Sequence, residues 1–187
     1  MERPGDMNAD LVVLTDDAGR PTGTADRTAV HTLDTPLHLA FSCFVVADGA
    51  ILMTRRALSK RTWPGVWTNS FCGHPRPDEA VEDAVRRYAP RELGLRVTDL
   101  QCVLPDFRYR AVDASGVVEN EICPVFVARP VGPVDAAPDE VAEHAWADVA
   151  DVWTSVRATP WAFSPWFADQ VAQLSPDDLL RPVAARS

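Results

Sequence analysis

The stretch from Thr68 to Gly94, TNSFCGHPRPDEAVEDAVRRYAPRELG, joins a short apolar segment to one amphipathic helix. The pattern predicts a strand over Thr68–Cys72 and a helix capped by Asp78 that continues to about Arg91, because acidic residues in the first turn suit the helix dipole. Gly94 is the residue type that ends helices in a left-handed conformation. Strand-like segments lie on both sides of this helix. They predict a mixed α/β (α+β) sandwich, with a mixed central sheet between helices, rather than a doubly wound parallel sheet.

The flanking segments complete this sandwich. The expected strands are Leu11–Thr15, His38–Ala47, Ile51–Arg55, Phe107–Val112, Val117–Ala128 and His144–Ala147. Residues 48–49 (Asp-Gly) and 113–116 are turn sequences and predict two hairpins. A final helix is expected over Ser164–Leu174, with Pro165 at its first position. We expect a single domain over 1–187, with flexible tails at 1–9 and 181–187.

The composition of the chain excludes several classes of protein. The 187 residues are 47% hydrophobic and 24% charged, which is typical of a soluble globular domain. No apolar run reaches the roughly 20 residues of a membrane span, and the first ten residues have no apolar stretch typical of a secretory signal. Four cysteines without paired spacing favour a reducing, cytoplasmic location. A net charge of −9 argues against nucleic acid as a partner, and we expect a monomer that acts on a small molecule.

Positive charge is concentrated in one segment of this acidic chain. Residues 54–61, TRRALSKR, contain the four cations Arg55, Arg56, Lys60 and Arg61 and no acid. Such a concentration is typical of an anion site, most often a phosphate site. A solvated surface loop is the ordinary alternative.

Two short motifs contain residues able to do chemistry. In WTNSFCGHP, Cys72 and His74 are two residues apart and therefore face the same side of an extended segment. In ENEICP, Glu119 and Glu121 project from one face of an otherwise apolar strand, about 7 Å apart. Two inward carboxylates repel each other and lose hydration unless a cation or a shared proton compensates. The alternatives are a buried structural cysteine and solvent-facing acids on an edge strand.

Histidines accompany these motifs. His31 and His38 lie seven residues apart, and with His74 they are three of the four histidines in the chain. Three imidazoles and two carboxylates fill five of the six positions around an octahedral divalent ion. A tetrahedral zinc site through Cys72 is the alternative, although the paired CxxC spacing of such sites is absent.

Four segments together resemble the type I isopentenyl-diphosphate isomerases, which have the Nudix fold. They are GTADRTAVHTLDTPLHLAFS, TRRALSKRTWPGVWTNSFCGHP, FRYRA with GVVENEICPVF, and TPWAFSPW. The similarity runs from about Leu11 to Gln173. It implies isomerisation of isopentenyl diphosphate to dimethylallyl diphosphate in isoprenoid biosynthesis, by metal-dependent protonation and deprotonation through a tertiary carbocation.

The resemblance also implies roles for individual residues. The family's metal ligands match His31, His38, His74, Glu119 and Glu121, where the ion would be Mn²⁺, Mg²⁺ or Zn²⁺. The proton-transfer pair matches Cys72 and Glu121, a supporting hydroxyl matches Tyr109, and the aromatic residue facing the hydrocarbon matches Trp166. The diphosphate-facing positions match Arg27, Arg56 and Lys60, with Arg27 at a place where lysine is expected. Glu92 matches the residue that holds a second ion, Mg²⁺, through the diphosphate.

The chain departs from the general Nudix pattern GX5EX7REUXEEXGU. Aligned from Gly73, the pattern matches Glu79, Arg87, Glu92, Gly94 and Leu95. Its Arg-Glu-U-x-Glu-Glu portion here reads RYAPRE, so two of the three carboxylates that hold magnesium for pyrophosphate hydrolysis are absent. Pro90 is expected to break or kink the last helical turn, which leaves open whether Glu92 keeps its place and holds the second metal. The alternatives are a Nudix pyrophosphohydrolase and a non-catalytic protein that binds a prenyl diphosphate or a metal.

Overall fold

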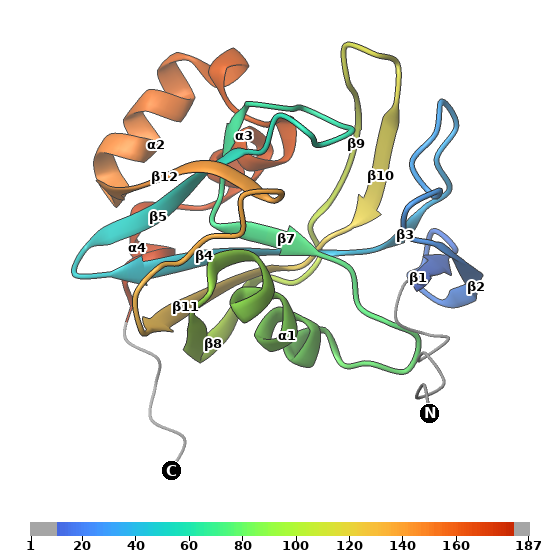
Figure 1. Ribbon diagram of the computed structural model, residues 1–187, viewed down its shortest axis with the longest axis horizontal. Helices are drawn as coiled ribbons and strands as arrows, with labels where there is room; N and C mark the ends of the chain where they lie inside the picture. The colour runs from blue at the N-terminus through green and yellow to red at the C-terminus, as the bar shows by residue number, and fades with distance from the viewer. Residues whose placement is uncertain (1–10, 182–187) are drawn as a thin grey trace.

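The computed structural model, which describes residues 11–181, contains two mixed sheets (Figure 1). The larger sheet has the order β12-β5-β4-β11-β8, in which β4 and β11 are parallel and the other neighbours antiparallel. Its strands are β12 (Val141–Asp148), β5 (Ala50–Arg56), β4 (Phe41–Ala47), β11 (Val125–Val131) and β8 (Arg96–Leu104). Two short strands, β6 (Trp67–Thr68) and β7 (Phe71–Gly73), pair with β5 and β4.

The smaller sheet has the order β2-β1-β3-β10-β9. Its strands are β2 (Pro21–Asp26), β1 (Leu11–Thr15), β3 (His38–Leu39), β10 (Val118–Ile122) and β9 (Arg108–Val112). Glu121 on β10 is paired with His38 on the parallel strand β3 and with Tyr109 on the antiparallel strand β9. The register of this sheet therefore places three of the predicted site residues side by side.

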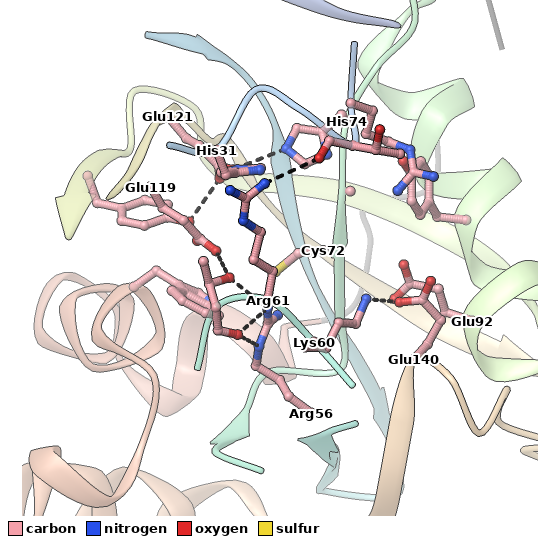
Figure 2. A pocket seen from close by; sticks show the side chains of 17 residues that line it. His31, Arg56, Lys60, Arg61, Cys72, His74, Glu92, Glu119, Glu121 and Glu140 are labelled. Atoms are coloured by element: carbon pink, nitrogen blue, oxygen red, sulfur yellow. Dashed lines mark hydrogen bonds and ion pairs between the residues drawn. The ribbon is translucent and has the colours of Figure 1, made fainter. Parts of the chain in front are cut away.

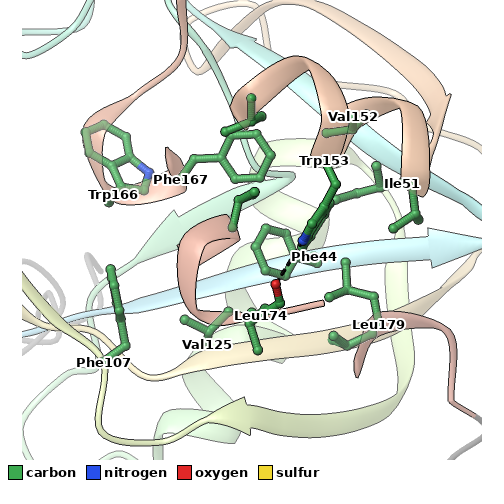
Figure 3. Packing of buried hydrophobic residues seen from close by; sticks show 14 of the residues in the cluster. Phe44, Ile51, Phe107, Val125, Val152, Trp153, Trp166, Phe167, Leu174 and Leu179 are labelled. Atoms are coloured by element: carbon green, nitrogen blue, oxygen red, sulfur yellow. Dashed lines mark hydrogen bonds between the residues drawn. The ribbon is translucent and has the colours of Figure 1, made fainter. Parts of the chain in front are cut away.

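Helices cover both faces of the larger sheet (Figure 1). α1 (Val81–Leu93) packs on one face, and α2 (Val149–Ala158), α3 (Pro165–Gln173) and α4 (Pro176–Leu180) pack on the other, with the short 3₁₀ helix η1 (Pro160–Ala162) between α2 and α3. Side chains of β4 alternate between the two layers: Phe44 packs with Trp153 and Phe167 (Figure 3), whereas Cys43 belongs to the cluster around Tyr88. Burying a large apolar side chain contributes about 1.5–3 kcal/mol, so these two layers fix the sheet that carries the site.

Two predicted strands are each divided between the two sheets. The segment 38–47 forms β3 in the smaller sheet and β4 in the larger one, and 117–128 forms β10 and then β11. Because the chain changes sheets at both places, Ala40 and residues 123–124 interrupt the pairing. The segment 68–72 also divides, into β6 and β7. The remaining predicted strands and the helix over 164–174 are confirmed to within a few residues, whereas β2, β8, α2 and α4 were not predicted.

The start of α1 differs from the prediction. The helix begins at Val81 after Ala80, and no side chain caps it. The prediction that Asp78 caps the helix is wrong, because this residue has a φ of 64° and lies in a left-handed turn before the helix. The predicted end is confirmed at Gly94, whose φ is 68°.

The helix also continues through Pro90 to Leu93, so the expected break is wrong. A proline near the helix end removes only one intrahelical hydrogen bond. The N–H groups of Asp135 and Ala137 donate to the carbonyls of Leu93 and Glu92 at 2.8 and 2.9 Å, and so satisfy the last turn from outside.

The expected tails lie outside the described residues, apart from Arg181. Within residues 11–181, no helix is both long enough and apolar enough to cross a membrane.

Candidate active site

A pocket of about 240 Å³ opens between the two sheets, the basic segment and the C-terminal end of α1 (Figure 2). Every predicted site residue lines it except His38, which is fully buried behind it. The lining includes Arg27, His31, Arg56, Lys60, Cys72, His74, Glu92, Tyr109, Glu119, Glu121 and Trp166. Predicted residues that are spread along the sequence from Arg27 to Trp166 therefore face one cavity.

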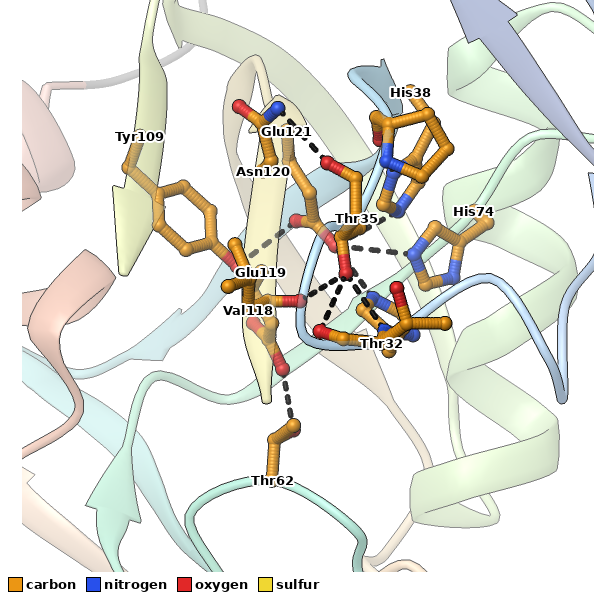
Figure 4. Close-up of polar contacts among 12 residues, drawn as sticks. Thr32, Thr35, His38, Thr62, His74, Tyr109, Val118, Glu119, Asn120 and Glu121 are labelled. Atoms are coloured by element: carbon orange, nitrogen blue, oxygen red, sulfur yellow. Dashed lines mark hydrogen bonds and ion pairs between the residues drawn. The ribbon is translucent and has the colours of Figure 1, made fainter. Parts of the chain in front are cut away.

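Three imidazoles converge on one carboxylate at the inner end of the pocket (Figure 4). The Nε2 atoms of His74, His38 and His31 lie 3.1, 3.4 and 3.6 Å from Oε1 of Glu121. The ligand atoms of these four residues all lie within 4.8 Å of one another. This group contains four of the five predicted metal ligands.

The chemistry of this group fits a divalent cation. His38 Nδ1 lies 2.9 Å from the carbonyl oxygen of Pro36, which can accept a hydrogen bond only from a protonated Nδ1, so in the neutral ring the Nε2 lone pair faces Glu121. His38 Nε2 and His31 Nε2 are buried and make no hydrogen bond. In a metal-binding histidine, one ring nitrogen binds the metal and the other usually donates a hydrogen bond, often to a backbone carbonyl. His38 has this second hydrogen bond.

The protonation states of His74 and Glu121 agree with this interpretation, whereas burial works to lower the pKa of His38 but is outweighed by the Glu121 carboxylate, so that this pKa is raised. Burial lowers the pKa of His74 to about 4, although the Glu121 carboxylate works against this, so its ring is neutral at pH 7. Burial works to raise the pKa of Glu121, but the three surrounding histidines hold it well below its ordinary value. A neutral imidazole and an ionised carboxylate are the forms that bind metal.

Glu119 is the one predicted ligand outside this group. It lies on the same strand as Glu121 and is equally buried, but its Oε1 accepts a hydrogen bond from the Thr62 hydroxyl. The Tyr109 hydroxyl lies 2.6 Å from its Oε2. Glu119 as a metal ligand therefore stays a prediction.

Cys72 and Trp166 line the pocket beside these acids. Burial raises the pKa of the Cys72 thiol to about 12, which keeps it protonated at neutral pH. The Trp166 ring packs against Trp63 and Tyr109, with ring centroids 5.3 and 5.7 Å away. The guanidinium of Arg56 lies 5.2 Å from the Trp166 ring centroid, so this ring already interacts with a cation.

The cationic wall contains part of the predicted basic segment. Arg56, Lys60 and Arg61 line the pocket together with Arg27, whereas Arg55 pairs with Glu143 outside it. Arg56 donates to the carbonyl of Thr62 from Nε at 3.0 Å and from Nη2 at 2.8 Å. Residues 54–61 are therefore not simply a solvent-exposed loop, which was the alternative interpretation of their sequence.

Glu92 lines the same wall, so Pro90 does not displace it from the pocket. Burial raises the pKa of its carboxyl group, while Lys60 acts to lower it. Burial also lowers the pKa of Lys60. Lys60 donates to Glu140 (Figure 2). Nη2 of Arg91 also lies 3.9 Å from the Glu140 carboxylate.

Two Nudix-pattern residues hold the loop that carries His74. Arg87 donates to both oxygens of Glu79, at 2.7 and 2.6 Å, and to the carbonyl of His74 at 3.2 Å. Tyr88, which stands where the pattern has a carboxylate, packs against Gly73. A Cβ at Gly73 would lie 2.7 Å from that ring, so only glycine fits between Cys72 and His74.

Sequence reasoning missed three residues of the pocket region: Asn69, Thr62 and Glu140. Their own residue types do not single them out, because each acts through a residue distant in the chain. Glu140 reaches Lys60 across 80 positions, Thr62 reaches Glu119 across 57, and Asn69 reaches Trp166 across 97. All four cysteines are free, as their spacing predicts.

Comparison with known proteins identifies the family. The NUDIX domain model matches residues 36–167. Proteins named isopentenyl-diphosphate Delta-isomerase are similar over most of the chain. That of Clavibacter michiganensis is 59% identical over 172 residues, covering 91% of this chain and 89% of its own. That of Salmonella paratyphi B is 52% identical over 167 residues, covering 89% and 92%. This chain belongs to the isopentenyl-diphosphate Delta-isomerase family.

Solved structures agree on the fold of the family. DR0079 from Deinococcus radiodurans superposes with a TM-score of 0.66 at 18% identity, covering 87% of this chain and 98% of its own. A MutT NUDIX hydrolase from Burkholderia pseudomallei superposes with a TM-score of 0.59 at 22% identity, covering 74% and 98%. At these identities the similarity shows the Nudix fold alone, and the predicted fold class is confirmed.

Proposed function

We propose that this enzyme of the isopentenyl-diphosphate Delta-isomerase family converts isopentenyl diphosphate to dimethylallyl diphosphate for isoprenoid biosynthesis. The observation that carries the proposal is the meeting of Cys72 and Glu121, from different sheets, in one pocket with a cationic wall. Its relatives' names support the same reaction. The lack of two Nudix-pattern carboxylates, replaced by Tyr88 and Arg91, disfavours pyrophosphate hydrolysis.

The cationic wall binds the diphosphate. Arg56, Lys60 and Arg27 supply charged donors, and charge-assisted hydrogen bonds to phosphate are about twice as strong as neutral ones. Glu92 lies beside Lys60 and is the residue that we propose for the Mg²⁺ carried by the diphosphate. Once the diphosphate is held here, the five-carbon chain extends toward Cys72 and Trp166.

Proton transfer uses Cys72 and Glu121. Moving the double bond requires one proton to add to the terminal alkene carbon and another to leave the carbon on the far side of the cationic centre. One group of the pair donates, the other accepts, and their roles exchange between the two directions of the reaction. Exchange with solvent then returns the pair to its starting state.

The intermediate is a tertiary carbocation, and the pocket stabilises it with an aromatic face. Trp166 is almost completely buried, at 1% exposure. A cation over an indole face gains about 2 kcal/mol when water is excluded. The Tyr109 hydroxyl orients the Glu121 carboxylate, whose Oε2 lies 2.9 Å away.

We propose that His31, His38, His74 and Glu121 hold a divalent ion, Mn²⁺, Mg²⁺ or Zn²⁺, with Glu119 as a fifth ligand. The ion supplies positive charge that tunes the acidity of the carboxyl group bound to it. The three histidines also have a positioning role, because they fix the orientation of the Glu121 side chain toward the pocket.

The test is incubation of the purified protein with Mg²⁺ in D₂O, in one sample with isopentenyl diphosphate and in a second with dimethylallyl diphosphate, followed by proton NMR. We expect the same mixture of isomers from either starting isomer, with deuterium incorporated. Phosphate or pyrophosphate release without isomerisation would show a hydrolase, and binding without turnover would show a non-catalytic protein. Protein stripped of metal by a chelator is the control.

A further inference from the structure

Asn69 connects two residues of the pocket that come from distant parts of the chain. It lies between β6 and β7, is fully buried, and has hydrogen-bond contacts to Cys72 on β7 and to Trp166 on α3. Its Oδ1 lies 3.1 Å from the indole Nε1 of Trp166 and 3.4 Å from the sulfur of Cys72. Its Nδ2 lies 3.3 Å from the same sulfur.

The orientation of this amide is fixed by its other partners. The indole N–H is only a donor, so the atom facing it must be the amide oxygen, which also accepts from the Thr68 hydroxyl at 2.8 Å. The backbone carbonyls of Phe71 and Cys43 are only acceptors, so the atom facing them, at 2.8 and 3.3 Å, must be the amide nitrogen. The amide therefore has one orientation, and both of its ends are occupied.

The Asn69 amide contacts both the Cys72 thiol and the Trp166 indole, on which the proposed chemistry depends. The thiol faces an acceptor and a donor on the same side chain, and its only other hydrogen-bond contact among the described residues is the Ser42 hydroxyl, 3.7 Å away. The indole N–H has no other acceptor among the described residues. A rigid anchor shared by a proton-transfer group and a cation-stabilising ring fixes their separation and mutual angle.

We propose that Asn69 is a positioning residue that sets the Cys72 thiol and the Trp166 indole relative to each other on either side of the hydrocarbon chain. This inference rests on the proposed function. Asn69 does not line the pocket, so it acts through these two residues and not through the substrate. Because the diphosphate is held elsewhere, substrate affinity depends little on Asn69, whereas turnover depends on it strongly.

The test compares Asn69→Leu and Asn69→Asp with a matched control, Thr54→Val. Leucine has a similar size and lacks both polar ends, whereas aspartate keeps an acceptor for the indole but loses the N–H donor. The Thr54 hydroxyl donates to the backbone carbonyl of Asn69 at 2.7 Å, so Thr54→Val removes a buried hydrogen bond to the same residue and leaves its amide intact. This control separates lost stability from lost positioning.

We expect kcat to fall by about 10- to 100-fold in both Asn69 variants, the scale of a small misplacement of reacting groups, with KM changed less than about 3-fold. Thr54→Val should keep its kcat despite a lower melting temperature. In ¹⁵N-labelled protein, the Trp166 indole N–H resonance, assigned from Trp166→Phe, should move in Asn69→Leu more than in Thr54→Val.

Several outcomes would overturn the inference. A kcat in both Asn69 variants equal to that of Thr54→Val would do so, as would an unshifted Trp166 resonance in Asn69→Leu. If Asn69→Leu does not fold, the nearly isosteric Asn69→Asp carries the kinetic test alone. An inactive wild-type protein is a different result, because it would overturn the proposed function as well.

Discussion

The hydroxyl oxygen of Tyr109 lies 2.9 Å from Oε2 of Glu121, and the same oxygen lies 2.6 Å from Oε2 of Glu119. One hydroxyl has one proton, so it cannot fully satisfy two ionised carboxylates at once. Burial and the two carboxylates raise the pKa of Tyr109 well above its usual value, so the hydroxyl keeps its proton. The pair of acids therefore needs a cation beside it or a shared proton, which is the reason to expect metal at the adjacent histidines.

Tyr109→Phe should lower kcat by about 10²-fold, the scale of a misplaced reacting group, because the Glu121 carboxylate loses the hydroxyl that orients it, and it should leave KM nearly unchanged. The ring contacts with Phe107 and Trp166 are retained by phenylalanine, so the fold is preserved. Steady-state kinetics and a melting curve check both parts. A variant with normal turnover would remove Tyr109 from the mechanism.

His74→Ala should lose most of the bound metal, because each ligand of such a site contributes strongly to affinity. The wild-type protein should hold about one ion at this site. Elemental analysis after gel filtration measures it. His144→Ala is the matched control, because the fourth histidine is exposed on β12, outside the cluster, and its loss should not change metal content. Full occupancy in His74→Ala would contradict the site.

Most of the fold could be predicted because the central strands of the larger sheet, β4, β5 and β11, are mostly apolar. The segments 38–47 and 117–128 were predicted as single strands, since apolar residues make up most of their length. Local pattern contains no sign that the chain changes sheets at Ala40 and Cys123, because that depends on which strand becomes the neighbour. The strand β2 was not predicted because its sequence, PTGTAD, is almost wholly exposed and has no alternation of apolar and polar residues.

The site could be predicted where residue types are unusual for their surroundings. Glu119 and Glu121 stand out because charges are rare in an apolar strand, and both are buried. Asn69 could not be predicted this way, because a buried amide is defined by partners such as Trp166 that only the fold brings near. The effect of Pro90 was also predicted wrongly, because the donors that complete the last turn come from residues 135–137.

Arg56→Ala and Lys60→Ala should each raise KM by about 10- to 100-fold, because charged hydrogen bonds to phosphate contribute roughly 1.5–3 kcal/mol each. Arg55→Ala is the matched control, since this neighbour on β5 pairs with Glu143 outside the pocket and should leave KM unchanged. Kinetics with isopentenyl diphosphate measure the effect. Equal KM values in all three variants would place the diphosphate elsewhere.

Glu79→Gln should lower the melting temperature at pH 7, and its difference from wild type should disappear as the pH falls well below 4.5. Partial burial works to raise the pKa of Glu79, but the Arg87 guanidinium holds it below the usual 4.5, so the pair stabilises above that value and is lost as the folded-state carboxylate protonates. The effect is at most about 1 kcal/mol, because the pair is partly solvated. Asp83→Asn, which alters an exposed pair with Arg86 on the same helix, is the matched control for removing one acid. A constant difference across pH would contradict the assignment.

Cys72→Ala and Glu121→Gln should fail in different ways. Cys72 has one proposed task, so its alanine variant should lose roughly 10²–10⁴-fold in kcat, the scale of one acid–base group, and keep its metal and substrate affinity. Glu121 faces three imidazoles as well as the pocket, so Glu121→Gln should lose activity and part of its metal, because an amide oxygen is a weaker ligand than a carboxylate. Kinetics and elemental analysis on both variants, with Cys102→Ala as the control for an exposed cysteine, decide between these tasks. A fully active Cys72→Ala protein would make Cys72 a packing residue and leave proton transfer without its second group.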